Sequence, residues 1–353
     1  MKNMKNFSLT ESTYQNLSLG LKIDWFNRLC HHLEIPAGDY SACTEKIFDY
    51  QHDRNLPASG IIDATTRLSL IKDFSDLGIQ TIGPNTATRL VIDTTQTESS
   101  QYHRLTDILS EQFHLVMSAP DCIQILAIRG LESDSDGWHQ TESAAQFLKK
   151  TYGTRDHFSS AKQNYDDTMI CLLWREDDVP HVQYFRGISN PCSIWPSGTA
   201  HLCTGQYCYK IGRHRTRETD HIKSVLECQA FWPRDWIYDV TPDSVQYVAL
   251  EGTSPIEVIR SHGDSLDISE DDIQTAEIAI AERRPDYTNE NYIKINIHTC
   301  AIDHASSLGC QNIKPYDYDD FIQTLLRVTN KTKMAHGFAL NILYSLIDAS
   351  YLI

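Results

Sequence analysis

Residues 292–312 read YIKINIHTCAIDHASSLGCQN, and this stretch decides how the rest of the chain is interpreted. Its first half alternates apolar and polar side chains, with isoleucines on one side and Lys294, Asn296 and His298 on the other. Alternation with a period of two is typical of a β-strand. We therefore expect a strand that buries its isoleucines and presents His298 on the opposite surface, near its C-terminal end.

A cysteine follows this strand at a short distance. Cys310 comes twelve residues after His298, behind a polar loop and directly after Gly309. A cysteine attacks carbonyl groups as its thiolate, and a neighbouring imidazole can accept the thiol proton. Gly309 permits a tight turn whose main-chain N–H groups can face an oxyanion, and Ser307 can orient either partner. The pattern indicates a nucleophile and its base. Its alternative is a buried core cysteine and a surface histidine.

The size and charge of the chain narrow the classes of protein. Its 353 residues suit two domains, or one large domain with a small appendage. A formal net charge of −16 argues against a nucleic-acid partner, because neutralising phosphates requires a basic surface. The N-terminal residues lack the apolar run of a secretory signal peptide, so we expect synthesis in the cytoplasm without one. The apolar residues 338–353 are too few to span a bilayer and include Asp348, so we expect a core strand or helix and no membrane span.

The ten cysteines are scattered, with no CxxC pair. This spacing is typical neither of a zinc ribbon nor of a small disulfide scaffold, and most of them are predicted to be small buried hydrophobes. Cys300 is a rival nucleophile, because it would lie on the same side of the strand as His298. A zinc peptidase remains an alternative, although HExxH and close His-x-His spacings are absent and no cofactor is expected. Its ligands would come from His214, His298, Asp303 and Cys310.

Residues 18–75 are expected to form a small domain of three short helices. Apolar residues recur at helical spacing in the first helix. The second, TEKIFDYQHDRNL at 44–56, would turn Ile47, Phe48 and Gln51 inward. The segment PASG then breaks the chain, and Asp63 is a suitable N-cap for the third helix.

This segment resembles the peptidoglycan-binding three-helix domain that accompanies many cell-wall enzymes. In that family an FQ pair precedes a leucine, a glycine and a final helix that contains threonine. Here Gln51, Leu56, Gly60 and Leu68 stand at the matching positions, although FQ is loosened to FDYQ. The resemblance implies that Gln51 and Gly60 belong to a peptidoglycan-binding module. A helical pad without a ligand is the alternative.

The remaining chain is expected to be mostly β, which makes the predicted fold class α+β. Residues 76–120 are expected to connect the two domains, with an exposed loop at 94–101 and an amphipathic helix at 104–116. Residues 121–353 would form the second domain. Helices are expected at 316–328 and at 269–284, the latter with an exposed acidic excursion as its alternative. Runs rich in β-branched and aromatic residues predict strands at 122–130, 168–174, 181–187, 200–212 and 245–252.

The run from His298 onward resembles the signature of the L,D-transpeptidase (YkuD-type) catalytic domain. In that family a histidine is followed by a loop and by Ser/Thr-His-Gly-Cys-x-Asn. Ser307, Gly309, Cys310 and Asn312 match, while a leucine replaces the second histidine and the loop is shorter than usual. The resemblance implies that Cys310 is acylated, that His298 is its base and that the amides of Gly309 and Cys310 form the oxyanion hole.

Further motifs resemble a divergent branch of that family, made of phage-like lysins and cell-wall hydrolases with an appended binding module. The resemblance implies that His214, Asn312, Arg129 and Tyr207 contact the substrate. A structural or exposed histidine is the alternative for His214, and a structural role is the alternative for Arg129. Asp235 would orient His214 or cap a turn. The motifs occur here in the expected order, as Ile128-Arg129-Gly130, residues 164–167 (NYDD), Gly198-Thr199-Ala200, Gly205-Gln206-Tyr207, Gly212 with His214, and Arg234-Asp235.

These resemblances imply a hydrolase of peptidoglycan stem peptides, as an L,D-carboxypeptidase or endopeptidase, or a transpeptidase. A wall-active enzyme without a signal peptide indicates a phage-type lysin or an antibacterial effector that acts in the periplasm of a target cell. An effector would need a component of a secretion apparatus and an immunity protein as partners. The alternatives are a non-catalytic wall-binding or virion protein and a zinc-dependent peptidase.

Overall fold

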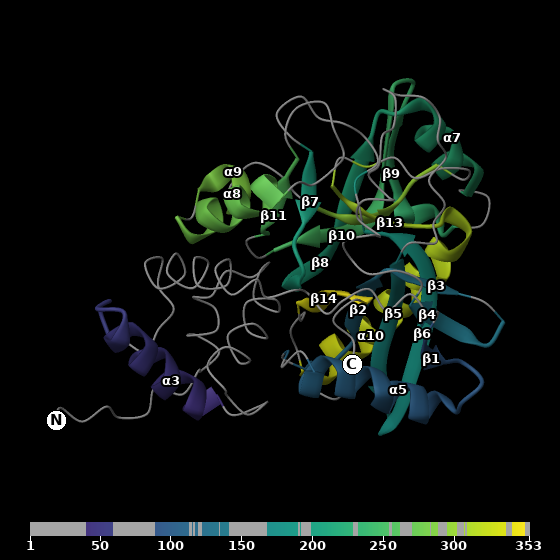
Figure 1. The fold of residues 1–353 in the computed structure, drawn as a ribbon. Coiled ribbons are helices and arrows are strands. Elements are labelled where there is room, and N and C mark those ends of the chain that lie inside the picture. The colour runs from purple at the N-terminus through teal and green to yellow at the C-terminus, as the bar shows by residue number, and fades with distance from the viewer. Residues whose placement is uncertain are drawn as a thin grey trace.

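The protein is a mixed α/β structure with a barrel-like sheet and few helices (Figure 1). The expected strands and the C-terminal helix are present, and the C-terminal apolar run is a strand of the core. The computed structural model describes residues 40–58, 89–112, 115, 117–118, 122–133, 135–140, 168–189, 191, 199–228, 232–253, 256–261, 270–282, 284–288, 295–301, 307, 309–336 and 341–349.

One nine-stranded sheet organises these residues, in the order β12-β13-β6-β5-β2-β14-β8-β10-β9. An additional pairing of Ile297 with Leu250 joins β12 to β10 and closes the sheet on itself. Two neighbouring pairs, β2–β14 and β12–β13, are parallel. The strands are β2 (Gln124–Arg129), β5 (Thr168–Glu176), β6 (Val179–Ile188), β8 (Gly205–Thr216), β9 (Ile237–Thr241), β10 (Ser244–Gly252), β12 (Ile297–Thr299), β13 (Gln311–Ile313) and β14 (Ile342–Asp348).

Two smaller sheets lie beside it. One contains β1 (Arg89–Asp93), β4 (Gly137–Gln140) and β3 (Leu131–Ser133). The other pairs β7 (Ala200–Leu202) with β11 (Val258–Arg260). The strand expected at 200–212 is therefore two strands in different sheets, because β7 pairs with β11 whereas β8 pairs with β10 and β14.

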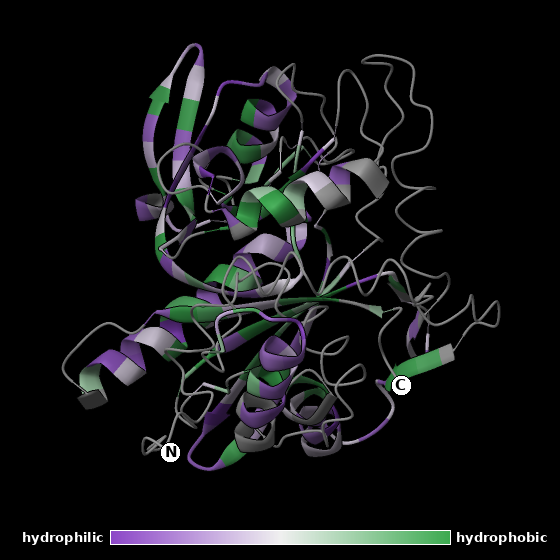
Figure 2. Ribbon diagram, turned by 60° about the vertical axis from the view of Figure 1, so that its left-hand side comes forward, coloured by the Kyte–Doolittle hydropathy of each residue, from purple (hydrophilic) through white to green (hydrophobic). Residues whose placement is uncertain are grey.

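Both faces of the central strands are buried. Along β2, Ile125 and Ala127 belong to one apolar core, while Leu126 and Ile128 belong to a second core on the other face. Strands covered on both faces read as continuous apolar runs, as QILAIR does. The strands across the middle of Figure 2 are accordingly mostly green, whereas the helices carry both colours.

Five helices outside the N-terminal region cover the sheets in the described part of the chain. None of the described helices is long and apolar enough to cross a bilayer. One differs from expectation, because residues 98–101 were expected as a loop and instead begin a helix whose N-cap is Thr97. The helices are α5 (Glu98–Asp107), followed by a π-helical turn (Ile108–Gln112), α7 (Thr219–Cys228), α8 (Glu270–Ala281), α9 (Pro285–Thr288) and α10 (Pro315–His336).

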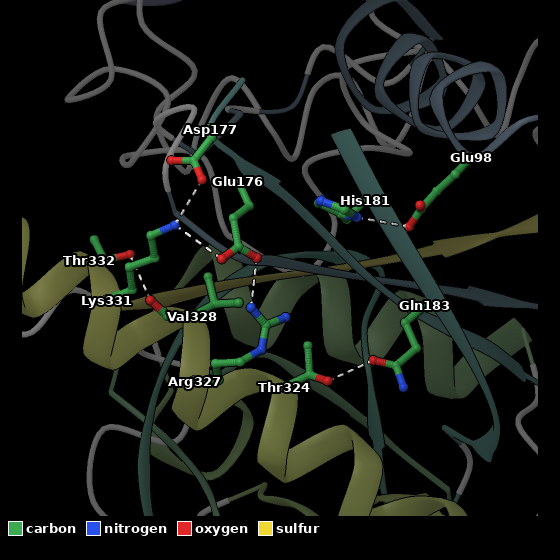
Figure 3. A network of polar contacts seen from close by, with 10 residues as sticks. All are labelled: Glu98, Glu176, Asp177, His181, Gln183, Thr324, Arg327, Val328, Lys331 and Thr332. Carbon is green, nitrogen blue, oxygen red and sulfur yellow. Dashed lines mark hydrogen bonds and ion pairs between the residues drawn. The ribbon is translucent and has the colours of Figure 1, made fainter. Parts of the chain in front are cut away.

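Polar contacts fasten two of these helices to the hairpin formed by β5 and β6 (Figure 3). Glu176 accepts hydrogen bonds from Arg327 at 2.7 Å and from Lys331 at 3.0 Å, both on α10. From the same helix, the Thr324 hydroxyl donates to Gln183 at 2.8 Å. On α5, Glu98 accepts the backbone N–H of Val182 at 2.8 Å. The hairpin thus holds α10, the helix that begins just after Cys310 and β13.

In the N-terminal region the structure describes one helix, α3 (Tyr40–Asp53), at the lower left of Figure 1. It agrees with the second expected helix. Ile47 and Gln51 are buried as predicted, whereas Phe48 is only partly buried. The helix ends where Asn55 adopts a left-handed φ of 54° and the N–H of Leu56 bonds to the carbonyl of Gln51. The first and third expected helices, with Gly60, lie outside the described residues.

Candidate active site

The site is built on two short parallel strands. In register, β12 and β13 pair Ile297 with Gln311 and His298 with Asn312. The Gln311 N–H also donates to the carbonyl of Asn296 at 2.9 Å, so the ladder continues just before both strands. Neighbours in register on a sheet present side chains on the same face, and Asn296, His298, Cys310 and Asn312 therefore share one face. From strand spacing, the α-carbons of His298 and Cys310 are about 8 Å apart, as diagonal neighbours.

His298 is buried, with 3% of its surface exposed, whereas the alternation predicted a surface position. The prediction was wrong because side chains from β8, β10 and α7 cover the polar face of β12. The ring of His214, on β8, stacks on the ring of His298 with centroids 3.8 Å apart and planes within 11°. His221 of α7 lies in a nearly parallel plane with its centroid 5.7 Å away. Tyr247 of β10 completes the cover.

The hydrogen bonds of His298 fix which ring nitrogen is the base. Its Nδ1 contacts the carbonyl oxygen of Thr299 closely and lies 3.2 Å from the Tyr247 hydroxyl. A carbonyl can only accept, so Nδ1 carries the proton and Nε2 keeps its lone pair. Burial lowers the pKa of His298 to about 4, against the opposing effect of the Thr299 carbonyl. At neutral pH this imidazole is therefore uncharged and able to accept a proton.

Cys310 directly precedes β13 and is partly exposed, unlike Cys300, which is buried after β12. Its Sγ accepts the backbone N–H of Asn296 at 3.4 Å. The packed surroundings raise the pKa of the thiol to about 11, although the hydrogen bonds from Asn296 and Ser307 lower it. The thiol and the imidazole are therefore both neutral at rest, and a thiolate has to be generated when substrate binds.

Ser307 and Gly309 shape the turn that carries the cysteine. The Ser307 hydroxyl donates to the Cys310 carbonyl at 2.8 Å and accepts the Gly309 N–H at 3.0 Å. Gly309 has a φ of +143°, and a Cβ there would lie 2.7 Å from the carbonyl oxygen of Ala200. Only glycine fits this position. The Gly309 N–H is turned toward Ser307 here, so the oxyanion hole expected from Gly309 and Cys310 stays a prediction.

The structure places His214 and Asn312 beside His298, together with Asn296, and their contact with a substrate stays a prediction. The side-chain amide of Asn296 donates to Nδ1 of His214 at 3.3 Å, and burial beside two other imidazoles lowers the pKa of His214 well below its ordinary value. The amide nitrogen of Asn312 is 3.4 Å from both ring nitrogens of His298. The Oδ1 atoms of Asn296 and Asn312 are buried and have no hydrogen-bond partner among the described residues.

Arg129 and Tyr207 have other contacts. Arg129 is 6% exposed and donates to the carbonyl of Leu202 at 3.2 Å, and buried Tyr207 donates to the carbonyl of Cys203 at 2.8 Å. Asp235 is exposed in a single helical turn (Arg234–Trp236). In α3, Gln51 is fully buried. Outside the described residues lie Gly60, 164–167, Gly198 and Asp303.

The imidazoles do not converge on a point. Because the rings of His214 and His298 are stacked, their in-plane lone pairs run side by side. Within the described ranges, no group of three or more His, Cys, Asp or Glu residues is arranged to hold a metal ion. The geometry suits proton transfer better than coordination.

Sequence reasoning missed Tyr247, His221 and Asn296. Asn296 carried a signal, because it lies two residues before His298 on the same side of an alternating strand. Tyr247 and His221 come from distant segments and carried none. Comparison with known proteins found no matching family model, no matching curated protein and no matching solved structure.

Proposed function

We propose that this chain is a cysteine-dependent peptidase or transpeptidase that acts on peptidoglycan stem peptides. The observation that supports it best is that Cys310, directly before β13, and His298, on β12, share one face of neighbouring parallel strands. The contact of Nδ1 with a carbonyl assigns the base role to Nε2 of the imidazole. The choice of substrate comes from the resemblance of Ser307-x-Gly309-Cys310-x-Asn312 to the L,D-transpeptidase signature. The proposed bond is an amide that links an L-centre to a D-residue.

The chemistry begins from two neutral groups. As the scissile carbonyl approaches, Sγ of Cys310 attacks its carbon and the thiol proton moves to Nε2 of His298. The tetrahedral intermediate collapses when the C–N bond breaks, and the imidazolium returns its proton to the leaving amine. A thioester on Cys310 remains. Nδ1–H stays bonded to the Thr299 carbonyl throughout, which stabilises the imidazolium.

Either of two acceptors releases the acyl group. His298 removes a proton from water or from the amine of a second stem peptide, and the acceptor attacks the thioester carbon. The C–S bond breaks and the proton returns to Sγ. Water gives carboxypeptidase or endopeptidase activity, whereas an amine gives transpeptidation. A wall-binding module beside the catalytic domain favours hydrolysis of assembled wall.

The proposal includes the rest of the chain and its setting. Residues 18–75 would be a three-helix peptidoglycan-binding module, and residues 121–353 an L,D-transpeptidase-like domain. The buried Gln51 of α3 is compatible with the inward position that the module requires. The substrate lies in the periplasm, so the chain would act there as an injected effector or a phage-type lysin. An effector would have an immunity protein and a component of a secretion apparatus as partners.

The experiment that tests this function is digestion of purified muropeptides, with products read by mass spectrometry. Wild-type protein should release a D-residue or exchange it for an added amine. Cys310→Ala and His298→Ala should each abolish the product, while Cys300→Ala should retain it because Cys300 is buried.

Two controls distinguish this proposal from the two alternative functions. Loss of activity with a chelator but not with a thiol alkylator would replace the thiolate mechanism with zinc chemistry. Binding of the wild-type chain to intact sacculi without any product would leave a non-catalytic wall-binding protein in its place.

A further inference from the structure

The hydroxyl of Tyr247 lies at the centre of a buried set of contacts behind the imidazole of His298. Tyr247 is fully buried on β10. Its Oη is 3.0 Å from the carbonyl oxygen of Thr299, 3.2 Å from Nδ1 of His298 and 2.8 Å from Nε2 of His221. These contacts lie on the side of the His298 ring that bears Nδ1, opposite the proposed base Nε2.

The number of available protons determines which of these groups donates a hydrogen bond and which accepts one. The phenol has one proton to donate, and the Thr299 carbonyl has none. The phenol therefore donates to Thr299, and His221 Nε2–H donates to the phenol oxygen. Nδ1–H of His298 points at the Thr299 carbonyl with the phenol oxygen beside it. In the other tautomer the Nδ1 lone pair would face the lone pairs of this carbonyl, and the one phenol proton could be donated to only one of the two groups.

His221 is itself held by the start of its helix. It lies in the first turn of α7, is 3% exposed, and its backbone N–H donates to Glu218 at 3.0 Å. The second carboxylate oxygen of Glu218 accepts the N–H of Asp220 at 3.2 Å, so the carboxylate caps the turn. The helix start therefore fixes the backbone position from which the His221 ring contacts the phenol.

We propose that Tyr247, supported by His221, is a positioning residue that holds His298 in the Nδ1–H tautomer and so keeps Nε2 free as the base. The phenol touches neither the thiol nor the scissile bond in this proposal, and it acts through His298. The catalytic consequence rests on the proposed function, while the tautomer does not.

The first test uses no substrate. Long-range ¹H–¹⁵N NMR on the full chain at pH 7 should show a protonated Nδ1 and a bare Nε2 in wild-type His298. Tyr247→Phe removes only the hydroxyl, which is one of the two oxygens beside Nδ1. The Thr299 carbonyl remains, so the Nε2–H tautomer should become detectable beside the Nδ1–H tautomer. The matched control is Tyr318→Phe, which removes a buried hydroxyl that donates to the Val248 carbonyl at 3.0 Å in the same core. Tyr318→Phe should leave the His298 spectrum unchanged.

The second test reads the reaction on muropeptides. Tyr247→Phe should lower kcat in proportion to the fraction of His298 that NMR finds in the Nε2–H tautomer, with little change in KM. The acidic limb of the pH–kcat profile of this variant should also shift. His221→Gln keeps an N–H donor and should lose less activity than His221→Leu. Tyr318→Phe should keep wild-type kcat.

The outcomes distinguish a failure of the positioning role from a failure of the proposed function. A single Nδ1–H tautomer in Tyr247→Phe with kcat within twofold of wild type would overturn the positioning role and leave the proposed function intact. The expected change of tautomer in a protein whose wild type makes no product would support the positioning role and overturn the proposed function.

Discussion

The imidazoles of His214 and His298 are stacked with centroids 3.8 Å apart and planes within 11°, although β8 and β12 are not neighbours in the sheet. The stack seals one face of His298 from water. Burial is the main reason that the pKa of His298 falls to about 4. The pair thus links the packing of the barrel to the protonation state of the proposed base.

Removing the covering ring should expose the base. In His214→Ala we expect the pKa of His298 to rise from about 4 toward 6.5, because water can then solvate the imidazolium. A protonated imidazole cannot accept the thiol proton, so the acidic limb of the activity profile should move to higher pH. NMR titration of His298 checks this directly. His52→Ala, which alters an exposed histidine of α3, should not move the limb, and an unmoved limb in His214→Ala would contradict the burial argument.

The thiol should alkylate slowly at neutral pH. Because the pKa of Cys310 is raised to about 11, its reaction with iodoacetamide should be slower at pH 7 than that of a free cysteine. The rate should then increase about tenfold per pH unit well beyond pH 9. Peptide mass spectrometry assigns the site, with Cys310→Ala as the blank. A plateau below pH 8 would indicate a preformed thiolate–imidazolium pair instead.

The turn before the nucleophile should accept no side chain. Gly309→Ala should lower the free energy of unfolding by about 2 kcal/mol, because the new Cβ meets the Ala200 carbonyl oxygen at a φ of +143°. Gly252→Ala is the matched control, since its Cβ meets the mobile end of the Ile256 side chain. Urea unfolding measures both. Equal losses in the two variants would contradict the strain at Gly309.

Acid should destabilise the fold through buried histidines. Burial lowers the pKa of His201 to about 3 and that of His298 to about 4. It also lowers the pKa of His214 well below its ordinary value. The unfolded chain binds protons near pH 6.5, so this stability is present above pH 6.5 and is lost as the pH falls toward the folded values. Between pH 7.5 and 5 we expect the free energy of unfolding, measured with urea, to fall by about 1 to 2 kcal/mol per histidine. His201→Gln should show a smaller loss, and a stability that did not fall would contradict the burial.

The sequence predicted those elements whose pattern is local. The apolar runs that became β2 and β5 were recognisable because both faces of these strands are buried. α10 was predicted from its spacing and acidic first turn, and it continues further than expected, to His336. The helix at Glu98 was missed although Thr97 and Glu98 are a favourable cap and first turn, because the polar run around them was interpreted as a loop.

The site was only half predictable for a physical reason. His298 and Cys310 lie in one continuous stretch, and the alternation correctly grouped Asn296 with His298. Their burial was not predictable, because it depends on β8, β10 and α7, which come from other parts of the chain. Tyr247 and His221 entered the site only through the closure of the sheet.

Acylation of Cys310 tests the central claim most directly. The full-length protein is mixed with a purified disaccharide-tetrapeptide, quenched in acid after short times, and read by intact-protein and peptide mass spectrometry. We predict a transient thioester adduct on the peptide that contains Cys310, absent in Cys310→Ala and slow to form in His298→Ala. Product formation by Cys310→Ala at the wild-type rate, or an adduct on Cys300 instead, would contradict the assignment of Cys310 as the nucleophile.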